Sequence, residues 1–269
     1  MTDVVRAIIL GIVEGLTEFL PVSSTGHMIL VEPLLRIPPE DSFWSAFVIF
    51  IQIGAILAVV VYFWRRLWRL TFPASKTPLR EHLIVKLVVA FLPAAVLGKL
   101  AGDFIEARLE HPLPVAVALI AGGAAILLIE RFFTRPTVTD AAAITLRQAF
   151  WIGCAQCVAM WPGVSRSAAT IMGGLVIGLS TAAAAEFSFF LAIPTMFAAG
   201  FYKVYRHRHD IHDDQMQLLA IGFVVSFVVA WVVVAAFMRY IQTHTFRPFA
   251  YYRIALGLAV IALLGQLSY

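Results

Sequence analysis

The chain has 269 residues, of which 61% are apolar and only 13% are Asp, Glu, Lys or Arg. Soluble domains carry about 45–50% apolar and about 25% charged residues, so this composition excludes an ordinary soluble protein and also a disordered chain. It predicts an all-α polytopic membrane protein with a single membrane domain over residues 1–269. The net charge of +4 lies in short clusters between apolar runs, which argues against nucleic acid as a partner.

The chain contains apolar segments with a polar turn and apolar segments without one. Residues 4–36 are broken by the turn Pro21-Val-Ser-Ser-Thr-Gly26, and residues 147–180 by the turn Pro162-Gly-Val-Ser-Arg-Ser167. A helix needs about 20 apolar residues to cross about 30 Å of hydrocarbon. Six uninterrupted stretches meet this length and are predicted to be transmembrane helices. Three follow the first turn, at 44–64, 82–101 and 113–133, and three follow the second, at 185–205, 216–239 and 249–268.

Each broken segment is too long for one crossing and too interrupted for two. Non-helical backbone at membrane depth must be buried in protein or line a wet cavity. The sequence therefore predicts that 4–36 and 147–180 are two re-entrant pairs of half-helices. Glu14 and Glu18 also interrupt the first apolar region, so we expect the N-terminus to be mature structure rather than a cleaved signal.

The basic residues of the short loops predict the orientation, because cytoplasmic loops carry an excess of Lys and Arg. The segments 64–82 and 131–147 are basic and should be cytoplasmic, whereas 103–110 and 203–214 also carry acidic residues and should face outward. Following the crossings, the first broken segment then enters from outside, the second enters from the cytoplasm, and the C-terminus ends outside.

The same order of elements occurs twice. Repeat 1 covers about residues 1–135 and repeat 2 about residues 145–269, and each contains a broken segment followed by three crossings. An offset of 142 residues aligns Ser23 with Ser165, together with a few other identities. An odd number of crossings turns the second half upside down. Inverted-topology repeats with discontinuous helices place a binding site where the two halves meet.

Two carboxylates lie on one helix face in the first broken segment. Glu14 and Glu18 are four residues apart, inside apolar sequence and with no Lys or Arg one turn away. One interpretation is a structural ion pair or a protonated packing acid. The sharper interpretation is a divalent-cation site, because Mg²⁺ or Ca²⁺ prefers carboxylate oxygens and phosphate can complete its shell. Intramembrane ionisable residues are functional by default, which favours the second interpretation.

The first turn carries three hydroxyls and a histidine. Ser23, Ser24 and Thr25 precede His27 where the next half-helix begins. Such residues are ordinary helix N-caps. A helix N-terminus also binds anions through its free N–H groups, and a hydroxyl there can donate hydrogen bonds or act as a nucleophile. Together with two nearby carboxylates, these residues favour phosphate chemistry.

The second turn supplies positive charge. Ser165, Arg166 and Ser167 begin another half-helix, and a guanidinium can bind phosphate oxygens bidentately. A permanent ion pair of Arg166 with Glu14 or Glu18 is the alternative. The inverted arrangement is expected to bring two helix N-termini, the arginine and the carboxylates to one point, which fits phosphoryl chemistry on an anionic headgroup whose tail stays in lipid.

Two further patterns concern packing. Lys86, Lys99 and Arg253 lie near the ends of apolar stretches, and we expect their charged ends to reach the membrane interface. The spacing of Gly11 and Gly15 predicts a close approach between helices.

Two motifs resemble those of a known family. Glu14-Gly-Leu-Thr-Glu18-Phe-Leu-Pro-Val-Ser-Ser-Thr-Gly-His27 and Pro162-Gly-Val-Ser-Arg-Ser-Ala-Ala-Thr170 closely resemble the signature motifs of the undecaprenyl-diphosphate phosphatase family, also known for bacitracin resistance. The resemblance extends over nearly the whole chain. It implies a multi-pass hydrolase of the bacterial inner membrane that removes the terminal phosphate from undecaprenyl diphosphate and so recycles the carrier lipid for cell-wall synthesis.

The resemblance also implies roles for individual residues. It makes Ser24, His27, Glu18 and Arg166 catalytic, Glu14 and Glu18 metal-associated, and Ser23, Thr25, Ser165, Arg166, Ser167 and Thr170 phosphate-binding. It implies a divalent cation, Mg²⁺ or Ca²⁺, as cofactor, a prenyl diphosphate lipid as substrate, membrane lipid as surroundings, and a site open to the periplasmic side. Whether the chain forms a homodimer is left open.

Two mechanisms and a rival function stay open at this point. His27 could accept the proton of Ser24 while that hydroxyl attacks the terminal phosphorus, or His27 could itself be the nucleophile. A transporter or flippase of a prenyl phosphate or another anion would need similar binding groups but no nucleophile with its base. The acid-phosphatase-like lipid phosphatases are disfavoured, because Met172 stands in the region where that family would carry a second motif histidine.

Overall fold

The computed structural model describes residues 1–38, 40–73, 77–109, 111–133, 135–206 and 215–264. Within these residues the secondary structure is helical, apart from one isolated bridge between Val138 and Leu179. This confirms the all-α prediction. The segment 207–214, which belongs to one of the two loops expected to face outward, lies outside the described residues.

Five of the described helices are long and apolar enough to cross a membrane, and each covers one of the predicted stretches. They are α3 (Ser42–Tyr62), α5 (Leu83–Leu109), α6 (Pro112–Phe132), α9 (Thr181–Arg206) and α10 (Met216–Tyr240). The last predicted stretch, 249–268, forms α11 (Arg247–Leu263), and its residues 265–268 lie outside the described residues. The chain is therefore a multi-pass helical membrane protein.

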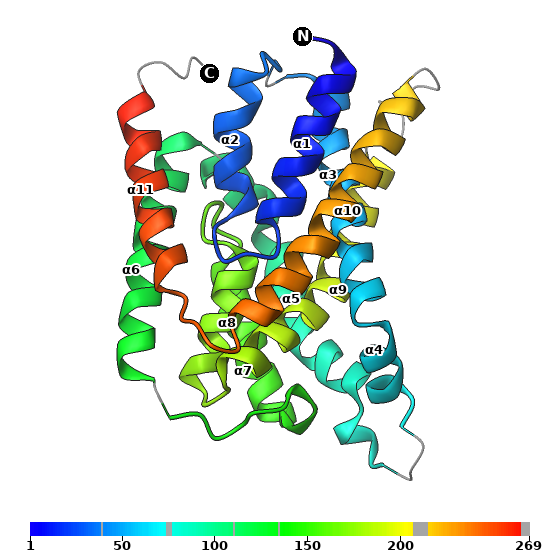
Figure 1. The fold of residues 1–269 in the computed structure, drawn as a ribbon, viewed down its shortest axis with the longest axis vertical. Coiled ribbons are helices and arrows are strands. Elements are labelled where there is room, and N and C mark those ends of the chain that lie inside the picture. Colours follow the sequence, from blue (N-terminus) through cyan, green and yellow to red (C-terminus); the bar gives the residue numbers. More distant parts are fainter. Residues whose placement is uncertain (39, 74–76, 110, 134, 207–214, 265–269) are drawn as a thin grey trace.

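Both broken segments form helical hairpins. The first consists of α1 (Asp3–Thr17) and α2 (Ser24–Leu34), and the second of α7 (Leu146–Val158) and α8 (Arg166–Val176). In Figure 1, α1 and α2 run from the end of the molecule that holds the N-terminus to its middle, and α7 and α8 occupy the other half. The short helix α4 (Trp64–Thr71) and the 3₁₀ turns Leu79–Glu81 and Ala141–Ala143 complete the fold.

The two hairpin turns share one unusual backbone conformation. Ser23 and Ser165 are the N-caps of α2 and α8, and each has a φ of 72°, a region that residues other than glycine rarely adopt. The Ser23 hydroxyl accepts a hydrogen bond from the amide of Gly26, and the Ser165 hydroxyl accepts one from the amide of Ala168. These two serines are the pair that the predicted offset aligns.

Glycines allow α1 to lie directly on α10, as their spacing predicted. A Cβ atom on Gly11 would be 2.9 Å from the backbone oxygen of Gly222, and one on Gly15 would be 2.8 Å from that of Ser226. Neither oxygen can move without disturbing α10. The first hairpin is therefore fixed to a membrane helix along its first arm.

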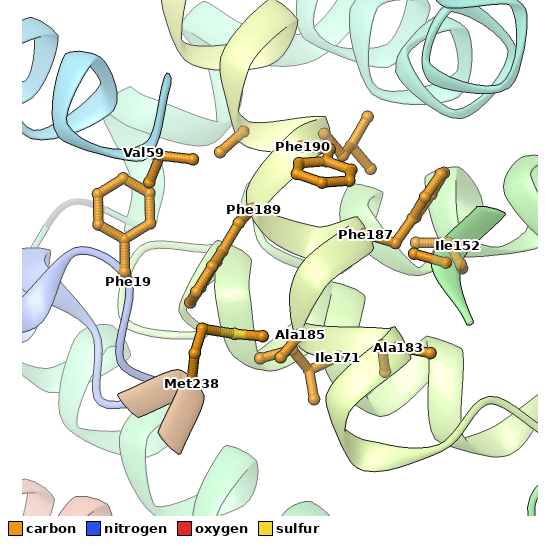
Figure 2. Close-up of a cluster of buried hydrophobic side chains, with 14 of the residues drawn as sticks. Phe19, Val59, Ile152, Ile171, Ala183, Ala185, Phe187, Phe189, Phe190 and Met238 are labelled. Carbon is orange, nitrogen blue, oxygen red and sulfur yellow. The ribbon is translucent and has the colours of Figure 1, made fainter. Parts of the chain in front are cut away.

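An aromatic cluster anchors the first turn in the core. Phe19 is fully buried and meets Phe189 of α9 edge-to-face, with 5.3 Å between the ring centroids (Figure 2). Phe187 and Phe190 from the same helix extend this cluster. Because Phe19 directly follows Glu18 in the chain, its packing fixes where the carboxylate enters the turn.

Lys86 makes a specific contact near the start of α5, which the sequence did not predict. Lys86 is buried at the start of α5, and its ammonium group donates to the backbone oxygen of Ala142 at 2.7 Å. The connection between α6 and α7 passes over this end of α5 and provides the acceptor. A bilayer-based argument could not foresee this contact, because it depends on how that connection folds back.

Candidate active site

The first turn pairs a carboxylate with a hydroxyl. Glu18 follows the last residue of α1, Ser24 begins α2, and the Ser24 hydroxyl donates to Oε2 of Glu18 at 2.7 Å. Ser24 is half-buried and Glu18 is 8% exposed. A serine hydroxyl held by a carboxylate with little exposure to solvent has a base for its proton, which is the arrangement that an activated nucleophile needs.

The second turn places its arginine against that carboxylate. Arg166 is the first residue of α8, and its Nη2 lies 3.6 Å from Oε1 of Glu18, while Nη1 donates to the backbone oxygen of Ser188 at 3.0 Å. Nε and Nη2 of Arg166 are buried and have no hydrogen-bond partner among the described residues. The ion pair considered from the sequence is therefore present with Glu18, but it leaves N–H groups that an anion could take.

The two turns are joined directly, as the inverted arrangement predicted. The hydroxyl of Ser167, fully buried in α8, donates to the backbone oxygen of Leu20 in the first turn at 2.8 Å. Arg166 and Glu18 make the second connection. The prediction that the carboxylates, the hydroxyls and the arginine meet at one place is thus confirmed for these residues.

Arg253 of α11 makes the third connection, which was not predicted from the sequence. Its guanidinium is fully buried and donates to the backbone oxygens of Pro21 and Gly163, one from each turn, at 3.2 and 3.0 Å. It also donates to Ala118 of α6 at 3.2 Å. Gly122 makes room for it, since a Cβ atom there would overlap Nη2.

The expectation that Arg253 reaches the interface is therefore wrong. A cation near the end of an apolar stretch can snorkel outward or turn inward, and sequence position does not separate the two. The inward position of Arg253 could have been predicted from its place inside the apolar stretch 249–268, because an ionisable residue within a membrane segment is functional by default.

His27 lies in α2 with both ring nitrogens engaged away from Ser24. Nδ1 is 2.7 Å from the backbone oxygen of Ser23, and Nε2 is 2.7 Å from the hydroxyl of Tyr252 in α11. In this structure the Ser24 hydroxyl donates to Glu18 and not to His27, and the catalytic roles of Ser24 and His27 stay predictions. The spacing of a motif places these residues together on one turn, but it does not decide which side chain accepts the serine proton.

The remaining predicted phosphate-binding residues fall into two groups. Ser23 and Ser165 cap their helices, and Thr25 is half-buried in the first turn of α2. Thr170 is fully buried and its hydroxyl lies 2.6 Å from that of Ser188, so it and Ser167 bind protein atoms in this structure. Phosphate binding by these five residues stays a prediction.

Glu14 fits a metal-binding role. Its carboxylate is fully buried, and neither oxygen has a hydrogen-bond partner in the described part of the chain. A buried carboxylate without donors is costly unless a cation compensates it. No group of three or more His, Cys, Asp or Glu residues that could hold a metal lies within the described ranges, so phosphate and water would have to complete the shell.

An apolar cavity of about 790 Å³ lies next to the second turn, between α6 and the hairpin of α7 and α8. Its lining includes Val164 and Ala168, which flank the Ser165–Ser167 segment, and otherwise consists almost entirely of aliphatic and aromatic side chains. The polar site therefore has an apolar space at its edge.

Fold and site together define a class: a helical membrane protein in which two hairpin turns bring a carboxylate-bound serine to an arginine with free N–H groups. The chain belongs to the family described as Bacitracin resistance protein BacA, whose sequence profile matches residues 7–259. Three relatives named undecaprenyl-diphosphatase are similar over nearly their full length. The protein of Rhodopseudomonas palustris (strain BisB18) is 48% identical over 264 residues, 98% of each chain. Those of Nitrobacter hamburgensis and Bradyrhizobium sp. (strain ORS 278) are each 47% identical, over at least 97% of each chain.

Proposed function

We propose that this chain hydrolyses undecaprenyl diphosphate to undecaprenyl phosphate and inorganic phosphate, which returns the carrier lipid to cell-wall synthesis and confers resistance to bacitracin. The names of its relatives supply the substrate. The observation that carries the proposal is the hydrogen bond from Ser24 to Glu18 beside the guanidinium of Arg166. These three groups provide a nucleophile, a base and an anion-binding donor within one site.

In the proposed reaction, Ser24 Oγ attacks the terminal phosphorus and its proton passes to Oε2 of Glu18. The bond between that phosphorus and the bridging oxygen breaks, and undecaprenyl phosphate leaves. Water then hydrolyses the phosphoserine, releases inorganic phosphate and restores the hydroxyl. Arg166 binds the phosphoryl oxygens through its free N–H groups, where charge must be stabilised during transfer. In this mechanism Glu18, and not His27, is the base, because the carboxylate of Glu18 accepts the hydrogen bond from the Ser24 hydroxyl.

Glu14 and Glu18 are the residues that would hold a divalent cation. Glu18 already uses one oxygen on Ser24 and faces Arg166 with the other, so Glu14 contributes the free carboxylate. When bound, Mg²⁺ or Ca²⁺ would help neutralise the diphosphate. Without a cation, the carboxylate of Glu14 would repel the anionic substrate, which is the physical reason to expect that activity depends on added metal.

The apolar cavity beside the second turn suits the prenyl tail. A diphosphate bound at Arg166 would have Val164 and Ala168 at its side, and the cavity continues from there between α6, α7 and α8. Burying isoprenoid carbon against these side chains is favourable, whereas water or a polar headgroup would gain nothing from them. The tail would thus select a lipid diphosphate over a soluble one.

We further infer six transmembrane helices, two re-entrant hairpins and an inverted repeat. The contact pattern supports the repeat: α1 packs on α10 as α7 packs on α5, and α2 touches α11 as α8 touches α6. The identical φ of the two N-cap serines supports it too. Repeat 1 then ends near residue 135, and repeat 2 begins near residue 145.

The bacterial inner membrane is the inferred location, with the active site open to the periplasm. The basic helix α4 and the connection between α6 and α7 lie at the end of the molecule opposite the N-terminus (Figure 1). Basic segments favour the cytoplasmic side. This orientation turns the end that holds the first hairpin outward.

One assay separates this function from transport. Purified chain in detergent has no gradient, so release of phosphate from undecaprenyl diphosphate under Mg²⁺ or Ca²⁺ requires an enzyme. Binding of the lipid without release would favour the transporter or flippase. Ser24→Ala tests the mechanism: loss of turnover is expected, whereas near-normal turnover, or a phosphohistidine trapped by rapid quench, would make His27 the nucleophile.

A further inference from the structure

Tyr252 of α11 makes a close, well-oriented contact with His27 although neither motif contains it. Its hydroxyl is 2.7 Å from Nε2, and the two rings stack with 5.6 Å between centroids and an interplanar angle of 10°. Tyr252 is 47% exposed, so its contact with His27 lies at the protein surface and not in the packed core. The hydrogen bond and the stacking therefore describe a specific pair.

The partners of His27 determine its tautomer. The backbone oxygen of Ser23 can only accept, so Nδ1, which lies 2.7 Å from it, must carry a proton. A neutral imidazole has one N–H, which leaves a lone pair on Nε2. The Tyr252 hydroxyl then donates to Nε2. The hydrogen bond made by one nitrogen fixes the state of the other.

The contacts run from Tyr252 through His27 to Ser23, and Ser23 has a strained backbone conformation. Ser23 has a φ of 72° and immediately precedes the proposed nucleophile Ser24. Such a conformation costs about 1–3 kcal/mol and persists only where the surroundings hold it. In the second turn the backbone oxygen of Ser165, which has the same φ, is held by the amide of Ala169 at 3.0 Å. In the first turn, the imidazole of His27 reaches the corresponding oxygen.

We propose that Tyr252 is a positioning residue of the phosphatase: it holds His27 in the Nδ1–H tautomer, so that His27 fixes the Ser23 carbonyl and thereby the place of Ser24. This inference rests on the proposed function for its catalytic consequence, but the tautomer follows from the contacts alone. It gives His27 a positioning role in place of proton transfer. Helix α11 then contacts the first hairpin at two points: Tyr252 is hydrogen-bonded to His27, and Arg253 donates to the backbone oxygen of Pro21.

The test uses the full chain in detergent with Tyr252→Phe, which keeps the stacked ring and removes only the hydroxyl. Tyr251→Phe is the matched control, because this neighbour is 60% exposed. Two quantities are measured: kcat and KM for undecaprenyl diphosphate, and the ¹⁵N chemical shifts of the His27 ring, assigned by comparison with His27→Asn. The second quantity does not depend on catalysis, so it tests the contact even if wild type releases no phosphate.

For Tyr252→Phe we expect kcat to fall between about tenfold and a hundredfold, the range that follows from small misplacement of a reacting group. KM should change less than twofold, and the His27 shifts should move toward a mixture of tautomers. Tyr251→Phe should match wild type in both quantities. Unchanged His27 shifts in Tyr252→Phe, or changed shifts with unchanged kcat, would overturn the proposal.

A second variant, His27→Asn, tests whether Tyr252 acts through His27. Asparagine at position 27 can donate its amide N–H to the Ser23 oxygen without any tyrosine, so Tyr252→Phe should have no further effect on kcat in the His27→Asn background. An equal loss of kcat in both backgrounds would show that Tyr252 acts independently of His27 and would contradict the proposed chain of contacts.

Discussion

Arg253→Met should loosen both hairpin turns at once. The guanidinium donates to Pro21, Ala118 and Gly163 at 3.0–3.2 Å, and all three acceptors are backbone oxygens. A net value of about 1 kcal/mol for each hydrogen bond gives a loss of about 3 kcal/mol. For a chain of this size that corresponds to a fall in Tm of about 6–12 °C. Turnover should fall about a hundredfold, because the turns that carry Ser24 and Arg166 would shift.

The assay combines thermal unfolding in detergent with phosphate release from undecaprenyl diphosphate. Arg253→Lys should lie between wild type and Arg253→Met in Tm, since one ammonium cannot reach three carbonyls on separate elements. Arg239→Met is the control, because Arg239 lies exposed in the last turn of α10. If Arg253→Met kept the wild-type Tm and turnover, the bridging role of this arginine would be refuted.

Three further changes probe the metal, the packing and the tail. Glu14→Gln should raise the concentration of Mg²⁺ needed for half-maximal rate at least about tenfold, and an unchanged metal titration would contradict a ligand role. Gly15→Leu should lower Tm because its Cβ meets the α10 backbone, whereas Gly102→Leu, with nothing within 4 Å, should not; equal effects would refute the close packing. Ala121→Phe, which narrows the cavity, should raise KM for undecaprenyl diphosphate but not for farnesyl diphosphate, and a parallel rise for both would place the tail elsewhere.

The sequence predicted the hairpins because their signals are local. Proline ends a helix and serine caps one, so the turns at Pro21–Gly26 and Pro162–Ser167 could be located from residue types alone. The meeting of Glu18 with Arg166 agrees with the predicted inverted repeat, which would bring its two broken segments together. A buried carboxylate and a buried arginine have few other ways to be stabilised in a membrane.

What escaped prediction depends on contacts between distant elements. Arg253 lies near one end of an apolar stretch, and only the fold shows that its guanidinium turns toward backbone oxygens of the two hairpin turns instead of the interface. The backbone acceptor of Lys86 likewise depends on how the connection between α6 and α7 folds back. The motif placed His27 three residues after Ser24 and Glu18 six residues before it, and only the fold shows that the Ser24 hydroxyl donates to Glu18. The contact of Tyr252 with His27 could not be predicted from the sequence, because an aromatic residue near a helix end is expected at the membrane interface in any case.

We propose that Ser24, Glu18 and Arg166 form a phosphatase site acting on undecaprenyl diphosphate. The most direct measurement is phosphate release from this lipid by the purified chain with Mg²⁺ or Ca²⁺, compared with Glu18→Gln and Arg166→Ala. Wild type should release phosphate, and each variant should lose at least about a hundredfold in kcat, as expected for removing a base or an anion-stabilising donor. No release by wild type with either metal, or equal release by all three proteins, would show that these residues do not form a phosphatase site.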